Sequence, residues 1–156
     1  MTVFFIIIVL AIILQAAART GLNPHKHFRD NARIATGIAF IFTGISHFLM
    51  PAKFMEMMPS FLPAPVFLIY LSGFFEILGG VGLIVSRTKR LAAGGLILLL
   101  LAVFPANIYV ALNNVQLGGF MSYAIYQWLR LPMQFVLIGW VSWCAAEINE
   151  LRRKKQ

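Results

Sequence analysis

Long apolar segments alternate with short polar or basic ones along the chain. Five apolar segments carry few or no charged residues, and each approaches or meets the roughly 17 to 25 residues with which an α-helix crosses about 30 Å of hydrocarbon. They span residues 2–18, 34–50, 65–85, 91–112 and 128–146. The pattern predicts an all-α membrane protein with five transmembrane helices.

Small residues recur within the later segments. In lipid, such residues let two helix backbones approach closely and gain van der Waals contact. They are Gly37, Gly44, Gly73, Gly79, Gly80, Gly82, Ala92, Ala93, Gly94 and Gly95. The first segment is rich in isoleucine and has no glycine, which is typical of a peripheral helix facing lipid. We therefore expect a four-helix transmembrane bundle plus an additional N-terminal transmembrane helix.

Composition and charge agree with a membrane location. Of the 156 residues, 60% are hydrophobic and 12% are charged, whereas about a quarter of the residues of soluble domains are charged. Most of the 13 lysines and arginines fall in three regions that share one side of the membrane if there are five spans. They are Arg19, Lys26, Arg29, Arg33, Arg87, Lys89, Arg90, Arg152, Arg153, Lys154 and Lys155. The positive-inside rule then places the N-terminus outside and the C-terminus in the cytoplasm. We expect the membrane to be a plasma membrane, namely the inner membrane of a bacterium.

The net charge of +8 does not indicate nucleic-acid binding, because the cations mark the membrane topology. A basic tail over residues 149–156 is expected to contact anionic lipid headgroups, at about 1 kcal/mol per basic residue. Membrane lipids, and a protein partner or a second copy of the chain, are the expected partners. The chain divides into a first helix with its basic loop (1–32), a membrane domain (33–148) and this tail.

Four local features of the sequence bear on where a functional site can lie. The first segment ends in small residues, like a signal peptide, but no basic residue precedes it, so we expect it to be retained. His25 and His27 stand among cations in a loop, and no metal site is expected there. The lone Cys144 excludes an internal disulfide. The proline-rich segment 51–65 is expected at the membrane interface, with a short helix over 52–58, and is either a cover over the bundle or a plain connector.

Glu76 is the only charged residue of the third apolar segment. An ionised carboxylate costs about 2.5 to 3.5 kcal/mol at the bilayer centre on insertion scales, so it usually faces the bundle interior with a partner. His47 shares a helical stripe with Gly44, which predicts that it also faces inward. Pro105 removes a backbone donor from the fourth segment, and such a break is tolerated mainly beside a cavity.

These groups and other polar residues in the outer halves of four helices form the predicted site, an outward-facing pocket that binds a ligand or handles protons. Its members are His47, Glu76, Asn107, Tyr109, Gln127, Arg130 and Gln134. We expect Arg130 to approach Glu76 directly or through His47 or Gln134. The alternative is a buried hydrogen-bond network that only fixes the register of the helices.

The order and spacing of several short motifs resemble those of the DoxX family of small membrane proteins. The motifs are Gly44-Ile-Ser-His47-Phe, Gly73-x2-Glu76-x2-Gly79-Gly80, Phe104-Pro-Ala-Asn107-Ile-Tyr109 and Arg130-Leu-Pro-Met-Gln134, all within residues 33–143. The resemblance implies a four-helix membrane core. It also implies a role like those of the wider family: subunits of a thiosulfate:quinone oxidoreductase, components of membrane redox complexes, or chaperones of membrane-protein assembly. No catalytic residue is carried over.

Two functions are therefore expected. The first is an accessory subunit of a membrane redox system that binds a quinone or another small molecule, with His47 and Glu76 exchanging protons and Arg130 holding an oxygen. It requires a partner subunit, because no cysteine pair, clear haem ligands or dinucleotide fingerprint is evident. The second is a non-catalytic assembly or lipid-binding protein. A permease is disfavoured, since neither an internal repeat nor a pair of broken helices is evident.

Overall fold

The computed structural model describes residues 2–22 and 27–146, and over these residues the chain is all-helical. The elements are α1 (Thr2–Arg19), α2 (Phe28–Leu49), α3 (Pro51–Met55), α4 (Pro65–Ile84), α5 (Lys89–Asn113), the short 3₁₀ helix η1 (Gly119–Ser122) and α6 (Ala124–Ala145). His25 of the basic loop and the basic tail 149–156 lie outside the described residues.

Three helices, α2, α4 and α5, are long and apolar enough to cross a membrane. This agrees with the predicted membrane protein. The apolar stretch of α1, Val3–Arg19, is shorter. Polar residues in the first half of α6, among them Arg130, lower the mean hydropathy of that helix.

Helix α2 begins earlier than the sequence pattern predicted. The apolar segment was expected to start at residue 34, but the helix begins at Phe28, and Asp30 and Asn31 lie inside its first turns. Tertiary contacts explain the extension. The Asn31 side-chain amide donates to Gln15 Oε1 of α1 at 2.8 Å, and Arg29 donates to the Trp143 carbonyl of α6. The helix therefore continues because its first turns are held by two neighbours.

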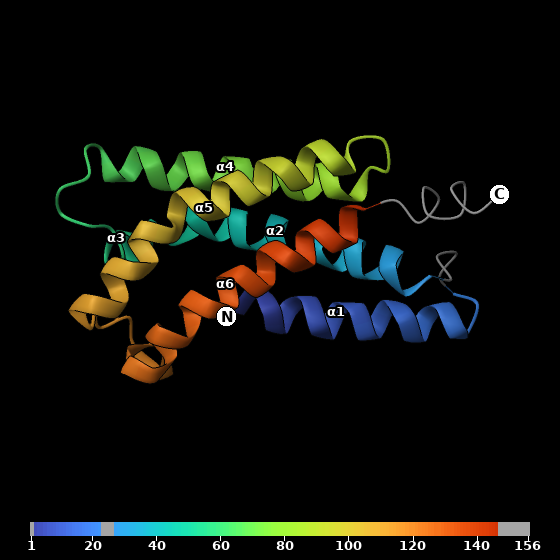
Figure 1. Cartoon of the computed structure of the whole chain (residues 1–156), viewed down its shortest axis with the longest axis horizontal. Coiled ribbons are helices and arrows are strands. Elements are labelled where there is room, and N and C mark those ends of the chain that lie inside the picture. Colours follow the sequence, from blue (N-terminus) through green and yellow to red (C-terminus); the bar gives the residue numbers. More distant parts are fainter. Residues whose placement is uncertain (1, 23–26, 147–156) are drawn as a thin grey trace.

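Helix α2 lies at the centre of the structure. It packs against α4, α1 and α6, and α5 packs against α4 and α6. Helices α2, α4, α5 and α6 thus form a closed set of contacts, with α1 outside it against α2 (Figure 1). One face of α1, including Ile7, is buried, whereas Phe5 and Ile12 are exposed.

Helices α2 and α4 touch through two pairs of glycines. A Cβ atom added at Gly37 would lie 2.7 Å from the Gly80 carbonyl oxygen, and one added at Gly44 would lie 2.7 Å from the Gly73 carbonyl oxygen. No real Cβ atom makes such a contact with a backbone. The predicted small-residue packing is therefore correct for these helices. It is wrong for Gly94 and Gly95 of α5, which have nothing within 4 Å of an added Cβ.

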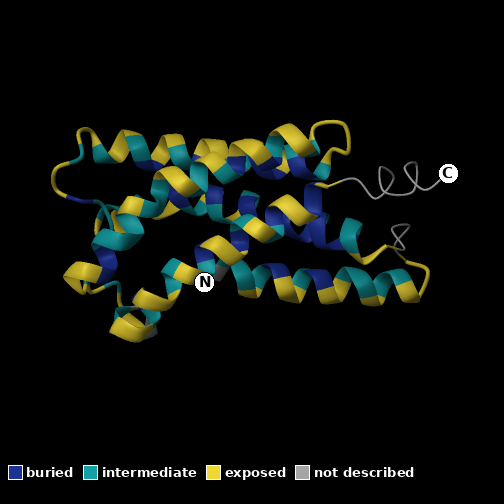
Figure 2. Cartoon of the chain, viewed as in Figure 1, coloured by how far each residue is buried: buried dark blue, intermediate teal, exposed yellow. Residues whose placement is uncertain are grey.

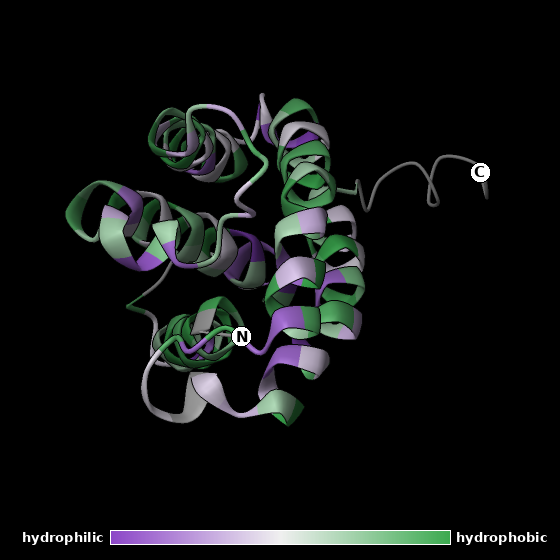
Figure 3. Ribbon diagram, turned by 90° about the vertical axis from the view of Figure 1, so that its left-hand side faces the viewer, coloured by the Kyte–Doolittle hydropathy of each residue, from purple (hydrophilic) through white to green (hydrophobic). Residues whose placement is uncertain are grey.

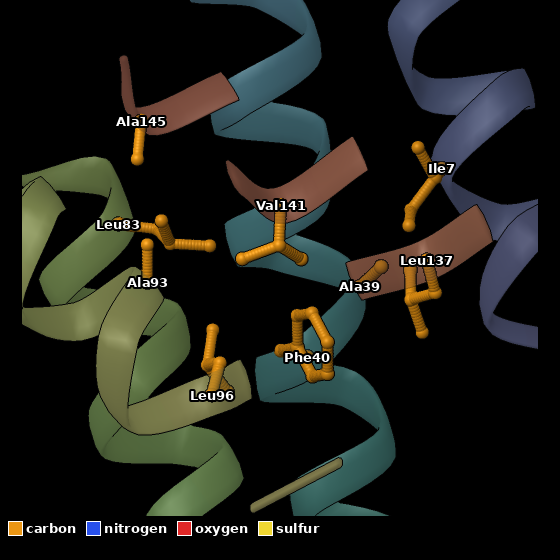
Figure 4. Close-up of a cluster of buried hydrophobic side chains, with 9 residues drawn as sticks. All are labelled: Ile7, Ala39, Phe40, Leu83, Ala93, Leu96, Leu137, Val141 and Ala145. Atoms are coloured by element: carbon orange, nitrogen blue, oxygen red, sulfur yellow. The ribbon is translucent and has the colours of Figure 1, made fainter. Parts of the chain in front are cut away.

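The main hydrophobic cluster occupies one half of the bundle. Five helices contribute to it (Figure 4): its members are Ile7, Ala39, Phe40, Leu83, Ala93, Leu96, Leu137, Val141 and Ala145. It lies toward the end at which α2 begins, α4 ends, α5 begins and α6 ends, which we call the basic end because Arg33 and Lys89 lie there. Buried positions line the facing sides of the helices and exposed positions their outer sides (Figure 2).

At the opposite end, which carries α3, the second half of α5 turns away from α4 (Figure 1). Pro105 lies inside α5, where it removes a backbone donor and bends the helix. The close approaches of α4 to α5 precede this bend: the added Cβ of Gly79 meets Leu96, and that of Gly82 meets Ala92. Seen from the α3 end, the helices are mostly hydrophobic with hydrophilic bands at some turns (Figure 3).

Candidate functional site

His47 of α2 and Glu76 of α4 face each other across the helix contact. The Nε2 atom of His47 lies 3.9 Å from Oε1 of Glu76, and the two side chains are only 11% and 18% exposed. The second carboxylate oxygen of Glu76, Oε2, is buried and has no hydrogen-bond partner among the described residues. The close packing of Gly73 against the His47 Cβ, 2.7 Å from an added Cβ, brings this histidine up to α4.

The other ring nitrogen of His47 is held by α4. Nδ1 lies 3.0 Å from the Ile69 carbonyl oxygen and 3.0 Å from Oγ of Ser72, and this hydroxyl lies 2.8 Å from the same carbonyl. The Ile69 carbonyl oxygen can only accept hydrogen bonds. A proton on Nδ1 therefore supplies the donor for the contact between Nδ1 and this carbonyl, and the Ser72 hydroxyl supplies the donor for its own contact with the carbonyl. The contacts therefore assign the proton to Nδ1 and leave Nε2 directed at Glu76.

The short helix α3 packs an aromatic ring against His47. The Phe54 ring lies against the His47 ring, with 3.9 Å between centroids and a tilt of 37°. The helix ends earlier than predicted, at Met55 rather than Met58. Ala64, with φ of 48°, then takes the left-handed conformation that turns the chain into α4.

Replacing Phe54 by alanine is expected to expose His47 without changing its bonds to α4. The rate at which diethylpyrocarbonate modifies His47, read by mass spectrometry of its peptide, should rise severalfold. Phe61→Ala is the matched control, because Phe61 lies in the same proline-rich segment but is 76% exposed. A rate that rises equally in both variants would contradict a specific covering role for Phe54.

A second polar group joins α5 to α6. The Asn107 amide nitrogen donates to Gln134 Oε1 at 2.6 Å, and Arg130 donates to Asn107 Oδ1 at 2.8 Å. The Gln134 amide nitrogen in turn donates to the Leu100 carbonyl, one residue before the carbonyl that lost its donor to Pro105. The side chains of this group therefore find their hydrogen-bond partners in one another and in the backbone of α5 beside its bend.

The remaining two predicted residues lie apart from both groups. Gln127 is buried and donates to the Val115 carbonyl at 2.7 Å, which ties the start of α6 to the connection that precedes it. Tyr109 is half-buried, and its backbone carbonyl accepts a bond from the Asn113 side chain at 2.9 Å.

The structure therefore separates the predicted site into two polar groups and two further residues, Gln127 and Tyr109. Within the part of the chain that is described, the ionic partner of Glu76 is His47, and the side-chain bond of Arg130 goes to Asn107. The expected approach of Arg130 to Glu76 is not found there. Sequence reasoning missed Phe54 and the Ile69 carbonyl as partners of His47. A backbone carbonyl has no sequence signature, whereas Ser72 could have been found, because it lies one helical turn before Glu76.

Comparison with known proteins gives a family but no characterised relative. A family model described as "Domain of unknown function (DUF8561)" matches residues 36–145, from the first half of α2 to the last residue of α6. No curated protein and no solved structure matches the chain. The matched range includes all seven residues of the predicted site and leaves out α1. Since it covers well over half of the 156 residues, the chain belongs to the DUF8561 family.

Proposed function

We propose that this membrane protein binds the polar group of a small apolar molecule at the His47–Glu76 pair. A quinone is the first candidate, and the proposed role is that of a DoxX-like accessory subunit of a membrane redox system. Five spans are proposed, with α1 and α6 crossing the membrane beside α2, α4 and α5, the N-terminus outside and the C-terminus in the cytoplasm. The gathering of Arg33 and Lys89 at one end of the bundle supports this orientation.

The observation that carries the proposal is the unpartnered oxygen of a buried carboxylate. A residue kept only to fix helix register is expected to have its polar atoms satisfied, as Asn107 and Gln134 do. Glu76 instead has Oε1 at 3.9 Å from His47, the Thr43 hydroxyl as a hydrogen-bond partner of its carboxylate, and a buried Oε2 without a partner among the described residues. An intramembrane carboxylate in this state is more consistent with a binding or proton-handling site than with packing.

The residues around the pair fit a quinone. Its ring carbonyl oxygens accept hydrogen bonds, and a proton on either His47 Nε2 or the Glu76 carboxyl supplies a donor. The Phe54 ring supplies an aromatic surface beside them. When bound, a quinone carries electrons and protons together, and the pair can hold a proton at this depth.

Glu76→Gln is expected to lower the quinone that co-purifies with the protein. The protein is purified from membranes, extracted with organic solvent, and the quinone is measured per protein by mass spectrometry. Glu56→Gln is the matched control, because Glu56 is an exposed glutamate at the same end of the bundle. Equal quinone in all three proteins, or none in any of them, would remove Glu76 from quinone binding.

The same extraction tests a second function, a non-catalytic lipid-binding protein. The observation in its favour is an apolar groove of about 440 Å³ between α1 and α2. It is lined by Phe5, Ile6, Val9, Leu10, Ile38 and Phe42. Phospholipid that is retained in fixed proportion, without quinone and irrespective of Glu76, would favour this function.

A further inference from the structure

We propose that the His47–Glu76 pair selects a hydroxyl group, of a phenol or an alcohol, over a carbonyl or ether oxygen. This inference rests on the proposed function, because it assumes that the pair binds a ligand. It adds the chemical class of the group bound: of the two redox forms of a quinone, the pair favours the quinol, whose ring hydroxyls both donate and accept.

The two facing atoms of the pair are close enough to share one bridging oxygen, which would lie to one side of the line that joins them. The 3.9 Å between Nε2 of His47 and Oε1 of Glu76 is too long for a direct hydrogen bond. A single oxygen can lie about 2.8 Å from both atoms at once, which is an ordinary hydrogen-bond length. The pair is therefore spaced to hold one oxygen between its members.

The pair offers that oxygen one donor and one acceptor. Because Nδ1 keeps its proton on the Ile69 carbonyl, Nε2 is an acceptor in the neutral ring and becomes a donor only in the imidazolium. With one further proton in the pair, either Glu76 donates and Nε2 accepts, or Nε2 donates and the carboxylate accepts. A hydroxyl group uses both members in either arrangement, whereas a carbonyl or ether oxygen accepts from only one.

The neighbouring hydroxyls have other acceptors. Ser72 lies 2.8 Å from the Ile69 carbonyl. The Thr43 hydroxyl hydrogen-bonds to the Glu76 carboxylate and also lies 3.1 Å from each of the carbonyls of Ala39 and Phe40. Its single proton therefore has the carboxylate and these two carbonyls as alternative acceptors. The buried Oε2 of Glu76 supplies a further acceptor at the same place.

The test compares 4-nonylphenol with 4-nonylanisole. The two ligands share the same ring and tail, but the phenol carries a hydroxyl group where the anisole carries a methoxy group. Binding to the full chain in detergent micelles is measured by equilibrium dialysis. The phenol is expected to bind about five- to tenfold more tightly, as one additional buried hydrogen bond implies. In the double variant His47→Phe/Glu76→Leu, which removes both hydrogen-bond partners of the hydroxyl, the ratio of affinities should fall to about one, whereas Glu56→Leu, at an exposed position, should keep it.

Three results would overturn the inference. Equal affinities in the native chain would show no selection, and the quinone measurement would still test the proposed function separately. A preference that survives in the double variant His47→Phe/Glu76→Leu would place the selection elsewhere. No binding of either ligand would mean that the gap holds water only. If the double variant does not fold, His47→Phe alone is compared with the native chain. It keeps a ring against Phe54 but removes the acceptor Nε2, so the advantage of the phenol should shrink.

Discussion

Gly80→Ala is expected to destabilise the protein by about 2 to 3 kcal/mol, the upper range for an added methyl group in a well-packed core. The added Cβ would lie 2.6 Å from the Gly37 carbonyl oxygen and 2.9 Å from a side-chain carbon of Ile41. Because the nearest atom belongs to a backbone, no rotamer change can relieve the contact. The two helices must move apart, and the contact between Gly44 and Gly73 then loosens as well.

Gly95→Ala is the matched control, since it makes the same substitution in another membrane helix. Gly95 has nothing within 4 Å of an added Cβ. Alanine is the better helix former by about 0.5 to 1 kcal/mol, so this variant should be neutral or slightly more stable. Both variants are compared by titration with a denaturing detergent, followed by circular dichroism. Equal stability of the two would contradict the proposed role of the glycine contact.

The glycine contact also links the fold to the site. Gly37 pairs with Gly80 and Gly44 with Gly73, so each helix presents glycines seven residues apart and the helices run antiparallel. His47 lies three residues beyond Gly44 and is packed directly on Gly73. Without Cβ atoms at these positions, the histidine ring reaches the Ile69 carbonyl and Glu76. The spacing of glycines therefore decides how close the two titratable groups come.

The helices themselves could be predicted from the sequence because each long apolar segment is bounded by prolines, glycines or charges. The ends were less predictable where a side chain from elsewhere extends the helix, as Asn31 does through Gln15. The facing glycines of α2 and α4 could be predicted from their spacing. The exposure of Gly94 and Gly95 could not be predicted from the sequence, because small residues occur both where two helices of the chain pack together and on an exposed helix surface.

The inward direction of His47 and Glu76 was predictable, since each shares a helical face with glycines. The choice of partners was not. Arg130 lies at a depth from which its long side chain could have reached either Glu76 or Asn107, and the bend at Pro105 brings α5 and its Asn107 to α6. Relative helix positions of this kind depend on packing, which hydropathy does not encode.

Arg33→Met is expected to destabilise the protein by about 2 to 4 kcal/mol, because bonds from a charged donor to carbonyls are each worth about 1.5 to 3 kcal/mol and their loss leaves buried acceptors unpaired. The Arg33 side chain is buried and donates to the Leu83 and Ile84 carbonyls of α4 at 2.5 and 2.8 Å. These are the last carbonyls of that helix, which lack partners within it. The positive charge also lies at the negative end of the α4 dipole.

Asp30→Asn separates this capping role from the ion pair beside it. Asp30 lies 3.4 Å from the Arg33 guanidinium, but its side chain is 38% exposed, so its removal should cost less than about 1 kcal/mol. Arg33→Lys should fall between the two, because lysine keeps the charge but lacks the planar fork that reaches two carbonyls. Stability is measured by the same detergent titration as for the glycine variants. If Asp30→Asn were as damaging as Arg33→Met, the ion pair rather than the capped end of α4 would hold α2 in place.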